Sequence, residues 1–162
     1  MNDLQWQDVA AGPVPGGGEA SFGAPADWSL LDPATFGAPA VVAAALEPER
    51  GGFRASAVLT ATAQEDLTFA DWQNRTDEEL PALLEDYRLV DLQHVQVAGR
   101  PGGRRLAHHV APGGTCAVLE QWSTVADGIG WSLTWTVDVL RYDAVHDLAR
   151  AGLDRFRIEA AR

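Results

Sequence analysis

Lysine is absent from this chain of 162 residues, so that all 12 of its basic residues are arginines. The absence excludes chemistry that needs a lysine amine, such as Schiff-base catalysis or a phosphate-binding loop lysine. Basic charge is also scarce overall, because 23 acidic residues leave a net charge of −11. A chain this acidic repels phosphate groups, so we expect no nucleic-acid partner and no binding to an anionic membrane surface.

Cysteine occurs once, as Cys116, which excludes an intramolecular disulfide and a cysteine-based zinc cage. We expect Cys116 to be a small buried residue. Apolar runs are short, and none approaches the roughly 18 residues that indicate a transmembrane helix. No secretory signal is visible in the first residues. The lack of a signal sequence and of long apolar runs predicts a cytoplasmic protein without a membrane span. Separately, the bias of the composition toward Ala, Gly and Arg is typical of GC-rich bacterial genomes.

Glycine and proline are concentrated in residues 10–26, at a density that cannot sustain a helix or an inner strand. We therefore expect residues 1–26 to form an irregular N-terminal arm. Residues 27–162 are expected to form a single α+β domain, because a chain of this length can bury a core without disulfides or metals.

Alternation and turn signals predict the elements of this domain. Two helical turns are expected between Thr68 and Tyr87, the first capped by Thr68 and the second by Asp77. Three strands should precede this helical region and four should follow it, separated by glycine-rich turns. These strands are expected at residues 28–31, 40–46, 53–62, 92–98, 104–111, 115–125 and 130–139.

The last predicted strand alternates most regularly, with its apolar side chains on one face: Trp131, Leu133, Trp135 and Val137. A final helix, capped by Asp143, carries an apolar stripe at helical spacing: Val145, Leu148, Ala149, Gly152, Leu153 and Phe156. Gly152 disfavours the helix by about 1 kcal/mol relative to alanine. We expect its role to be a close approach of this helix to the tryptophan face.

The element order βββ-α-ββββ-α predicts an α+β fold, with a mainly antiparallel sheet flanked by helices in an α/β/α sandwich. The first strand opens on Pro25-Ala26-Asp27-Trp28, the fourth ends at Gly99-Arg100-Pro101-Gly102, and the last helix ends in Arg155-Phe156-Arg157-Ile158. In this order and turn placement the chain resembles the PsbP-like α/β/α sandwich, and especially the actinobacterial LpqN-type proteins.

The resemblance covers roughly residues 22–160 and implies a scaffold that binds other proteins and has no shared active site. The chain departs from the LpqN type in lacking a lipobox cysteine, which puts a cell-surface role in doubt. It also has Ser56 where the family pattern predicts an asparagine. A helix-grip, lipid-transfer-like domain is the alternative fold, because it too closes with a long C-terminal helix.

Few residues are candidates for catalysis or metal binding. His108 and His109 are neighbours on a predicted strand and point to opposite faces, so they cannot bind one metal ion together. Glu120 lies among apolar residues and could act as a general base beside a histidine. The favoured interpretation is an outward-facing acid that forms an ion pair across the sheet with Arg104 or Arg105. We therefore predict a non-enzyme with no catalytic residue, no metal and no cofactor.

Two surfaces are candidates for binding. The first would dock a basic protein partner and combines an aromatic side chain with carboxylates: Trp72, Asp71, Asp77 and Glu78. The second would hold a small ligand on an open sheet face: Ser132, Thr134, Thr136 and His109. The leading hypothesis is a non-catalytic module that binds a protein, as an adaptor or chaperone-like protein. A small-ligand carrier is the alternative.

Overall fold

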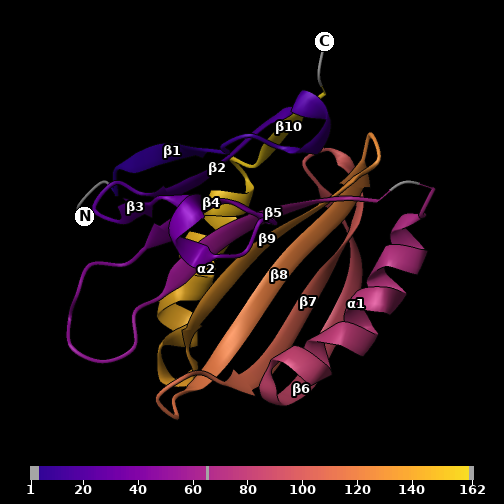
Figure 1. Cartoon of the computed structure of the whole chain (residues 1–162). Coiled ribbons are helices and arrows are strands. Elements are labelled where there is room, and N and C mark those ends of the chain that lie inside the picture. The colour runs from indigo at the N-terminus through magenta and orange to yellow at the C-terminus, as the bar shows by residue number, and fades with distance from the viewer. Residues whose placement is uncertain (1–3, 65, 161–162) are drawn as a thin grey trace.

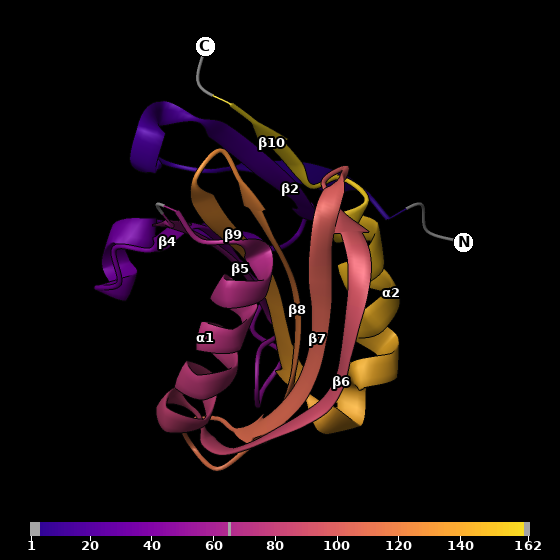
Figure 2. The same ribbon diagram turned by 90° about the vertical axis from the view of Figure 1, so that its right-hand side faces the viewer.

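In the computed structural model, which describes residues 4–64 and 66–160, seven strands form a large sheet and three form a small one. All pairings are antiparallel, and the large sheet has the order β3-β4-β5-β9-β8-β7-β6. Helices α1 and α2 lie on its opposite faces (Figures 1 and 2). The expected α/β/α sandwich is therefore confirmed. The seven strands are β3 (Ser29–Leu31), β4 (Val41–Leu46), β5 (Ser56–Ala63), β6 (Glu85–Val97), β7 (Arg100–Val110), β8 (Cys116–Ala126) and β9 (Ile129–Asp138).

The N-terminal segment is not the irregular arm that its composition predicted. It contains β1 (Trp6–Ala10) and β2 (Glu19–Pro25), which pair with each other. The other edge of β2 pairs with β10 (Arg157–Glu159), which completes the small sheet. A 3-10 turn, η1 (Pro15–Gly17), accommodates part of the glycine-rich stretch. Phe22 of β2 is fully buried, so this segment belongs to the core.

Helix α2 (Tyr142–Leu153) packs against the tryptophan face of the sheet, as its apolar stripe predicted. Trp131 and Trp135 are at most 2% exposed. A Cβ atom on Gly152 would lie 2.6 Å from the carbonyl oxygen of Gly23 and 2.7 Å from Cζ2 of Trp135. The expected close approach at Gly152 is therefore confirmed.

The end of the chain differs from the expected long terminal helix. Helix α2 stops at Leu153, and Asp143 lies within its first turn rather than capping it. Phe156 then enters the core, where it is fully buried. The residues that follow leave the helical path and pair with β2 as strand β10.

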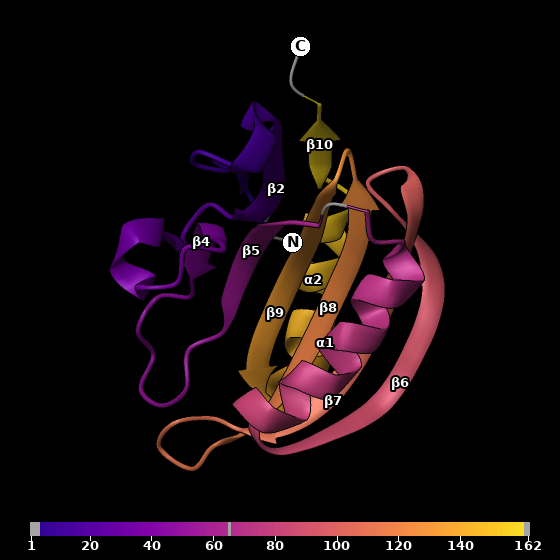
Figure 3. The same cartoon turned by 45° about the vertical axis from the view of Figure 1, so that its right-hand side comes forward.

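Helix α1 (Phe69–Leu83) crosses the other face of the sheet (Figure 3). It is one continuous helix rather than the two short ones predicted. A capping box between Thr68 and Asp71 starts it, and Pro81 lies within its last turns. No residue of α1 is fully buried, although the whole helix is described. Its packing is therefore lighter than that of α2.

Strand β6 begins at Glu85 and is longer than the predicted strand over residues 92–98. It forms one edge of the large sheet, and β3 forms the other. Among the described residues, no helix has the length and apolar character that a membrane crossing requires.

Replacing Gly152 with alanine tests the close packing of α2. A Gly→Ala change in an unconstrained helix stabilises it by about 1 kcal/mol. At this site the new methyl group meets a backbone oxygen and a buried indole, so we expect a net loss of about 1–2 kcal/mol in unfolding free energy from overpacking. Urea unfolding measures the change. The control is Ala144→Gly on the exposed side of α2, and a stabilised Gly152→Ala variant would contradict the packing described.

Candidate functional site

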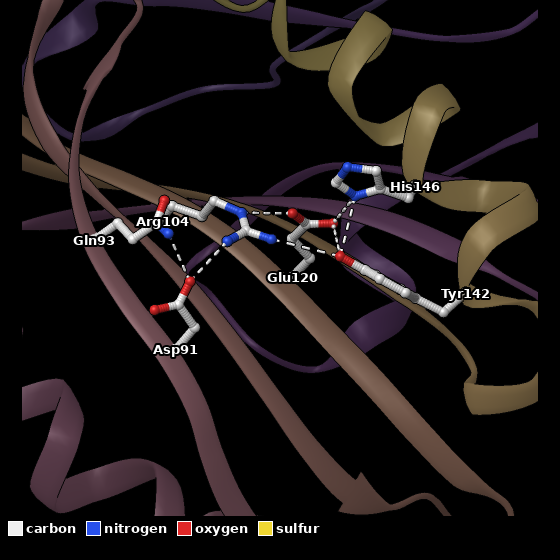
Figure 4. Close-up of polar contacts among 6 residues, drawn as sticks. All are labelled: Asp91, Gln93, Arg104, Glu120, Tyr142 and His146. Atoms are coloured by element: carbon white, nitrogen blue, oxygen red, sulfur yellow. Dashed lines mark hydrogen bonds and ion pairs between the residues drawn. The ribbon is translucent and has the colours of Figure 1, made fainter.

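The buried polar residues on the tryptophan face gather beside α2 (Figure 4). Glu120 is 2% exposed, because it lies on the same core-facing side of β8 as Trp122. Its Oε1 accepts a hydrogen bond from Nε of Arg104 at 2.6 Å. Its Oε2 accepts one from the Tyr142 hydroxyl at 3.2 Å and lies 3.0 Å from Nδ1 of His146. The carboxylate therefore joins the sheet to the first turns of α2.

Arg104 extends this cluster to the edge strand. Its Nη1 donates to Oδ2 of Asp91 on β6 at 3.2 Å, and its Nη2 donates to the Tyr142 hydroxyl at 3.4 Å. Gln93 donates to the same oxygen of Asp91 at 2.7 Å. A buried ion pair is stable only when further hydrogen bonds satisfy its remaining groups, and this network meets that condition for Arg104 and Glu120.

The surroundings fix the charge state of two members of the cluster. Burial raises the pKa of the Tyr142 hydroxyl, and the negative charge of Glu120 raises it further. Burial alone would lower the pKa of Arg104, but the hydrogen bond and charge of Glu120 outweigh it and the pKa is raised. Tyr142 therefore remains a neutral hydrogen-bonding group, and Arg104 remains a cation, across the physiological pH range.

The space beside this cluster is too small for a substrate. A cavity of about 10 Å³ lies among Glu120, Tyr142, His146 and apolar side chains of the sheet and helix. Such a volume holds about one water molecule, whereas small-molecule sites usually enclose about 300–1,000 Å³. The expected ion pair between Glu120 and Arg104 is present, but the expected outward orientation of Glu120 is wrong, because its side chain lies in the core. The small cavity beside it leaves little room for a general-base reaction.

A second buried carboxylate, Glu47, binds the residue that directly precedes α2. Glu47, at the end of β4, is 5% exposed. Arg141 donates two hydrogen bonds to it, at 2.8 and 2.6 Å, and the Ala55 amide donates a third at 3.0 Å. The hydrogen bond from Arg141 is the largest reason that the pKa of Glu47 lies below its usual value, while burial acts in the opposite direction. This pair ties the start of α2 to the β4–β5 connection.

The residues predicted as an acidic partner surface have different surroundings. Trp72 is half-buried, because its indole packs on the start of β9. Asp77 does not cap a helix; it forms an ion pair with Arg105, which is 3% exposed. Asp71 belongs to the capping box of α1. Glu78 is exposed, so of this set it is the residue best placed to meet a partner.

The strand register places the following residues on one side of the sheet: Ser132, Thr134, Thr136 and His109. Helix α1 crosses this side, and Ser132 and His109 are buried. The Ser132 hydroxyl lies 3.0 Å from that of Ser123, and the Thr134 hydroxyl accepts from Gln121 at 3.0 Å. His109 is buried, and within the described residues its Nδ1 has no hydrogen-bond partner. A ligand on this face stays a prediction.

Cys116 and His108 are the remaining candidates from the sequence. Cys116 is exposed rather than buried, because it begins β8 directly after a glycine-rich turn. His108 and His109 do occupy opposite faces of β7, since they pair with successive residues of β8. In the part of the chain that the structure describes, no group of three His, Cys, Asp or Glu residues is arranged to hold a metal ion.

Tyr142 and His146 were not identified from the sequence. They are four residues apart and flank the apolar stripe of α2 at Val145 and Ala149, so they face the same side of the helix. Once that stripe is assigned to the tryptophan face, the polar pair must meet whatever polar group the face carries. Glu120 is on that face by alternation, so the contact could have been predicted by combining the two patterns.

Comparisons with solved structures identify the fold. LpqN of Mycobacterium tuberculosis, a protein involved in cell envelope biogenesis, superposes with a TM-score of 0.69 and 17% identity, covering 98% of this chain and 92% of LpqN. The cyanobacterial PsbP (CyanoP) of Synechocystis sp. PCC 6803 gives 0.62 and 14% identity, covering 98% of this chain and 94% of CyanoP. The chain has a PsbP-like fold close to that of LpqN. The expected resemblance is confirmed at this level.

A third solved structure that matches is PA94, a Pseudomonas aeruginosa protein of unknown function. Its TM-score is 0.58 at 17% identity, and the alignment covers 78% of this chain and 83% of PA94. No protein-family model matches the chain, and no curated protein matches it by sequence. These identities support the shared fold and carry no information on activity.

A double-mutant cycle at Arg104 and Glu120 tests whether the PsbP-like core contains a coupled ion pair. Either single change to methionine leaves a buried charge without its main partner, so we expect each to lower the unfolding free energy by about 3 kcal/mol. The loss of unfolding free energy in the double variant should be smaller than the sum of the two single losses, by about 1 kcal/mol or more. Urea unfolding gives all three values. Additive losses would show that the two groups do not interact, and Arg88→Met on the exposed part of β6 serves as the control.

The lowered pKa of Glu47 predicts an acid-sensitive contribution to stability. A carboxyl group with a lowered pKa stabilises the fold above its usual pKa of 4.5, and the stabilisation is lost as pH falls below that value. Glu47→Gln should therefore be less stable than the wild type near neutral pH, with the difference narrowing below pH 4.5. Urea midpoints across this range measure it. Glu49→Gln, an exposed neighbour, should follow the wild-type curve, and a constant difference at Glu47 would contradict the assignment.

Proposed function

We propose that this protein is a non-catalytic module that binds another protein through the exposed acidic side of α1. The observation that carries the proposal is the concentration of charge there. Residues 66–86, which comprise α1 and its flanking residues, contain seven acidic residues and one arginine, a net charge of −6 out of −11 for the chain. Four of these acids lie in α1 itself. A localised field of one sign attracts a partner of the opposite sign and accelerates its association.

The buried carboxylates Glu120 and Glu47 support a structural role rather than a catalytic one. Glu120 and Glu47 are each held by an arginine and by further hydrogen bonds. The cavity beside Glu120 measures only about 10 Å³. Stable, fully paired groups with no room for a substrate are what a scaffold requires, and they support the assignment as a non-enzyme.

The structure narrows the binding surface that the sequence suggested. Asp77 and Asp71 already take part in an internal ion pair and a helix cap, so reversing them would damage the helix itself. Glu78 and Glu79 are exposed on the outward side of α1 and are the acids whose reversal leaves those contacts intact. They are therefore the residues on which the proposal should be tested.

Charge reversal at Glu78 and Glu79 to arginine is the test. In a pull-down from the native host, a partner captured by the wild-type chain should be retained about tenfold less by the double variant, and its capture should weaken with salt. A matched control reverses Glu19 and Glu49, which are exposed acids outside α1. Equal capture by both variants, or no captured protein with the wild type, would count against the proposed function.

A further inference from the structure

Strand β6 leaves a regular, unpaired edge on the large sheet. We propose that residues 91–97 of this edge bind an extended, uncharged segment of a partner protein, which adds to the sheet as an eighth strand. The proposal concerns a different surface from the acidic side of α1 and goes beyond the function proposed above. Addition of a strand to an open sheet edge is a general mode of peptide recognition, in which main-chain hydrogen bonds supply affinity.

The two halves of β6 differ in how well they are protected from such pairing. Its first half has register shifts between Glu85 and Arg88 and between Leu89 and Asp91, and bulges of this kind discourage edge pairing. Residues 91–97 then pair one for one with β7, without interruption. This second half contains no proline, glycine, lysine or arginine, so it lacks the residues that usually block an edge.

Nothing in the described chain covers the outer side of this segment. Strand β6 is last in the sheet order, so within the described residues no strand pairs with its outer edge. Helices α1 and α2 lie over the two faces of the sheet rather than along this edge (Figure 2). A row of main-chain N–H and C=O groups is therefore open to a partner strand.

Two hollows flank the end of the open edge, one on each face of the sheet. On the α1 side a hollow of about 360 Å³ is lined by the following residues: Phe69, His94, Val95, Gln96, Pro101 and Gly102. On the α2 side a hollow of about 410 Å³ is lined by the following residues: Gln96, Ala98, Gly99, Leu153, Asp154, Phe156 and Arg157. Gln96 borders both hollows, so they lie at the same level of the strand.

This arrangement matches the geometry of an added strand. Successive side chains of a strand point to opposite faces, so neighbouring residues of a bound segment can enter the two hollows. The α1-side hollow suits an apolar side chain because Phe69 and Pro101 line it. The α2-side hollow suits a polar one because Asp154 and Arg157 line it.

Charge favours a partner segment over a second copy of this chain. Two copies would each bring a net charge of −11, and their mutual repulsion opposes edge-to-edge pairing. Residues 92–97 carry no acidic or basic side chain apart from His94, so they offer no counter-charge to a charged strand. An uncharged extended segment suits this edge, and one apolar side chain on it would fit the α1-side hollow.

The proposal is tested on the full chain with a synthetic peptide of alternating threonine and valine that carries one central phenylalanine. Hydrogen exchange followed by NMR should show alternate amides of residues 91–97 slowed at least tenfold at saturating peptide, with shifted signals at Phe69. A peptide of the same length interrupted by two prolines should cause neither change, because it lacks the necessary N–H groups. Unchanged exchange, or slowing confined to another segment, overturns the proposal.

Proline variants locate the binding groups without knowledge of a natural partner. Along an antiparallel edge strand, alternate residues direct their main-chain groups outward, so one of His94 and Val95 has an outward N–H. Of the variants His94→Pro and Val95→Pro, the one with the higher unfolding midpoint marks the outward residue. It should bind the threonine–valine peptide at least tenfold more weakly than the wild type, and undiminished binding overturns the proposal.

Two further measurements separate this proposal from its alternatives. The Glu78→Arg and Glu79→Arg double variant should bind the peptide as the wild type does, so that failure of the acidic-surface proposal leaves this one standing. Sedimentation of the peptide-free chain should show a monomer. A dimer whose formation protects residues 91–97 would make a second copy the occupant and overturn the proposed partner segment.

Discussion

The contact between α2 and the tryptophan face is the interaction on which the rest of the structure depends. Gly152 allows the helix to approach both Trp135 and the β2 backbone, so one residue joins the large sheet, the helix and the small sheet. Buried carboxylates fix the other end of the helix: Glu47 holds Arg141 at its start, and Glu120 holds Tyr142 and His146 in its first turns. Because these polar groups are satisfied by each other, the core tolerates them.

The opposite face is organised differently. Helix α1 has no fully buried residue, and it is held by half-buried aromatics and by the ion pair between Asp77 and Arg105. The acidic side of α1 belongs to this half of the molecule, and the open edge of β6 borders both halves (Figure 3). Lightly packed elements open more easily than a core and are where binding surfaces are commonly found. The chain thus combines a tightly packed half, built on α2, with a more lightly packed half, built on α1.

Local patterns predicted the elements whose faces differ strongly in polarity. The alternation from Trp131 to Val137 and the stripe from Val145 to Phe156 identified β9, α2 and their contact. Pairing between distant segments left no such signal: β2 joins β10 from the far end of the chain, and the glycine and proline density around Pro15 indicated only the turn between β1 and β2. Glu120 was expected to face outward, although alternation with Val118 and Trp122 puts it on the core-facing side. Its partners on α2 required a tertiary contact to be inferred first.

The account predicts two levels of stability within one small protein, and native-state hydrogen exchange measures them directly. Amides of α2, β8 and β9 should exchange only through global unfolding, with opening free energies equal to that of the whole chain. Amides of α1 should exchange through local openings of lower free energy, because no residue of that helix is fully buried. Equal protection of α1 and α2, or local opening of α2, would contradict the division into a tightly packed half and a lightly packed half.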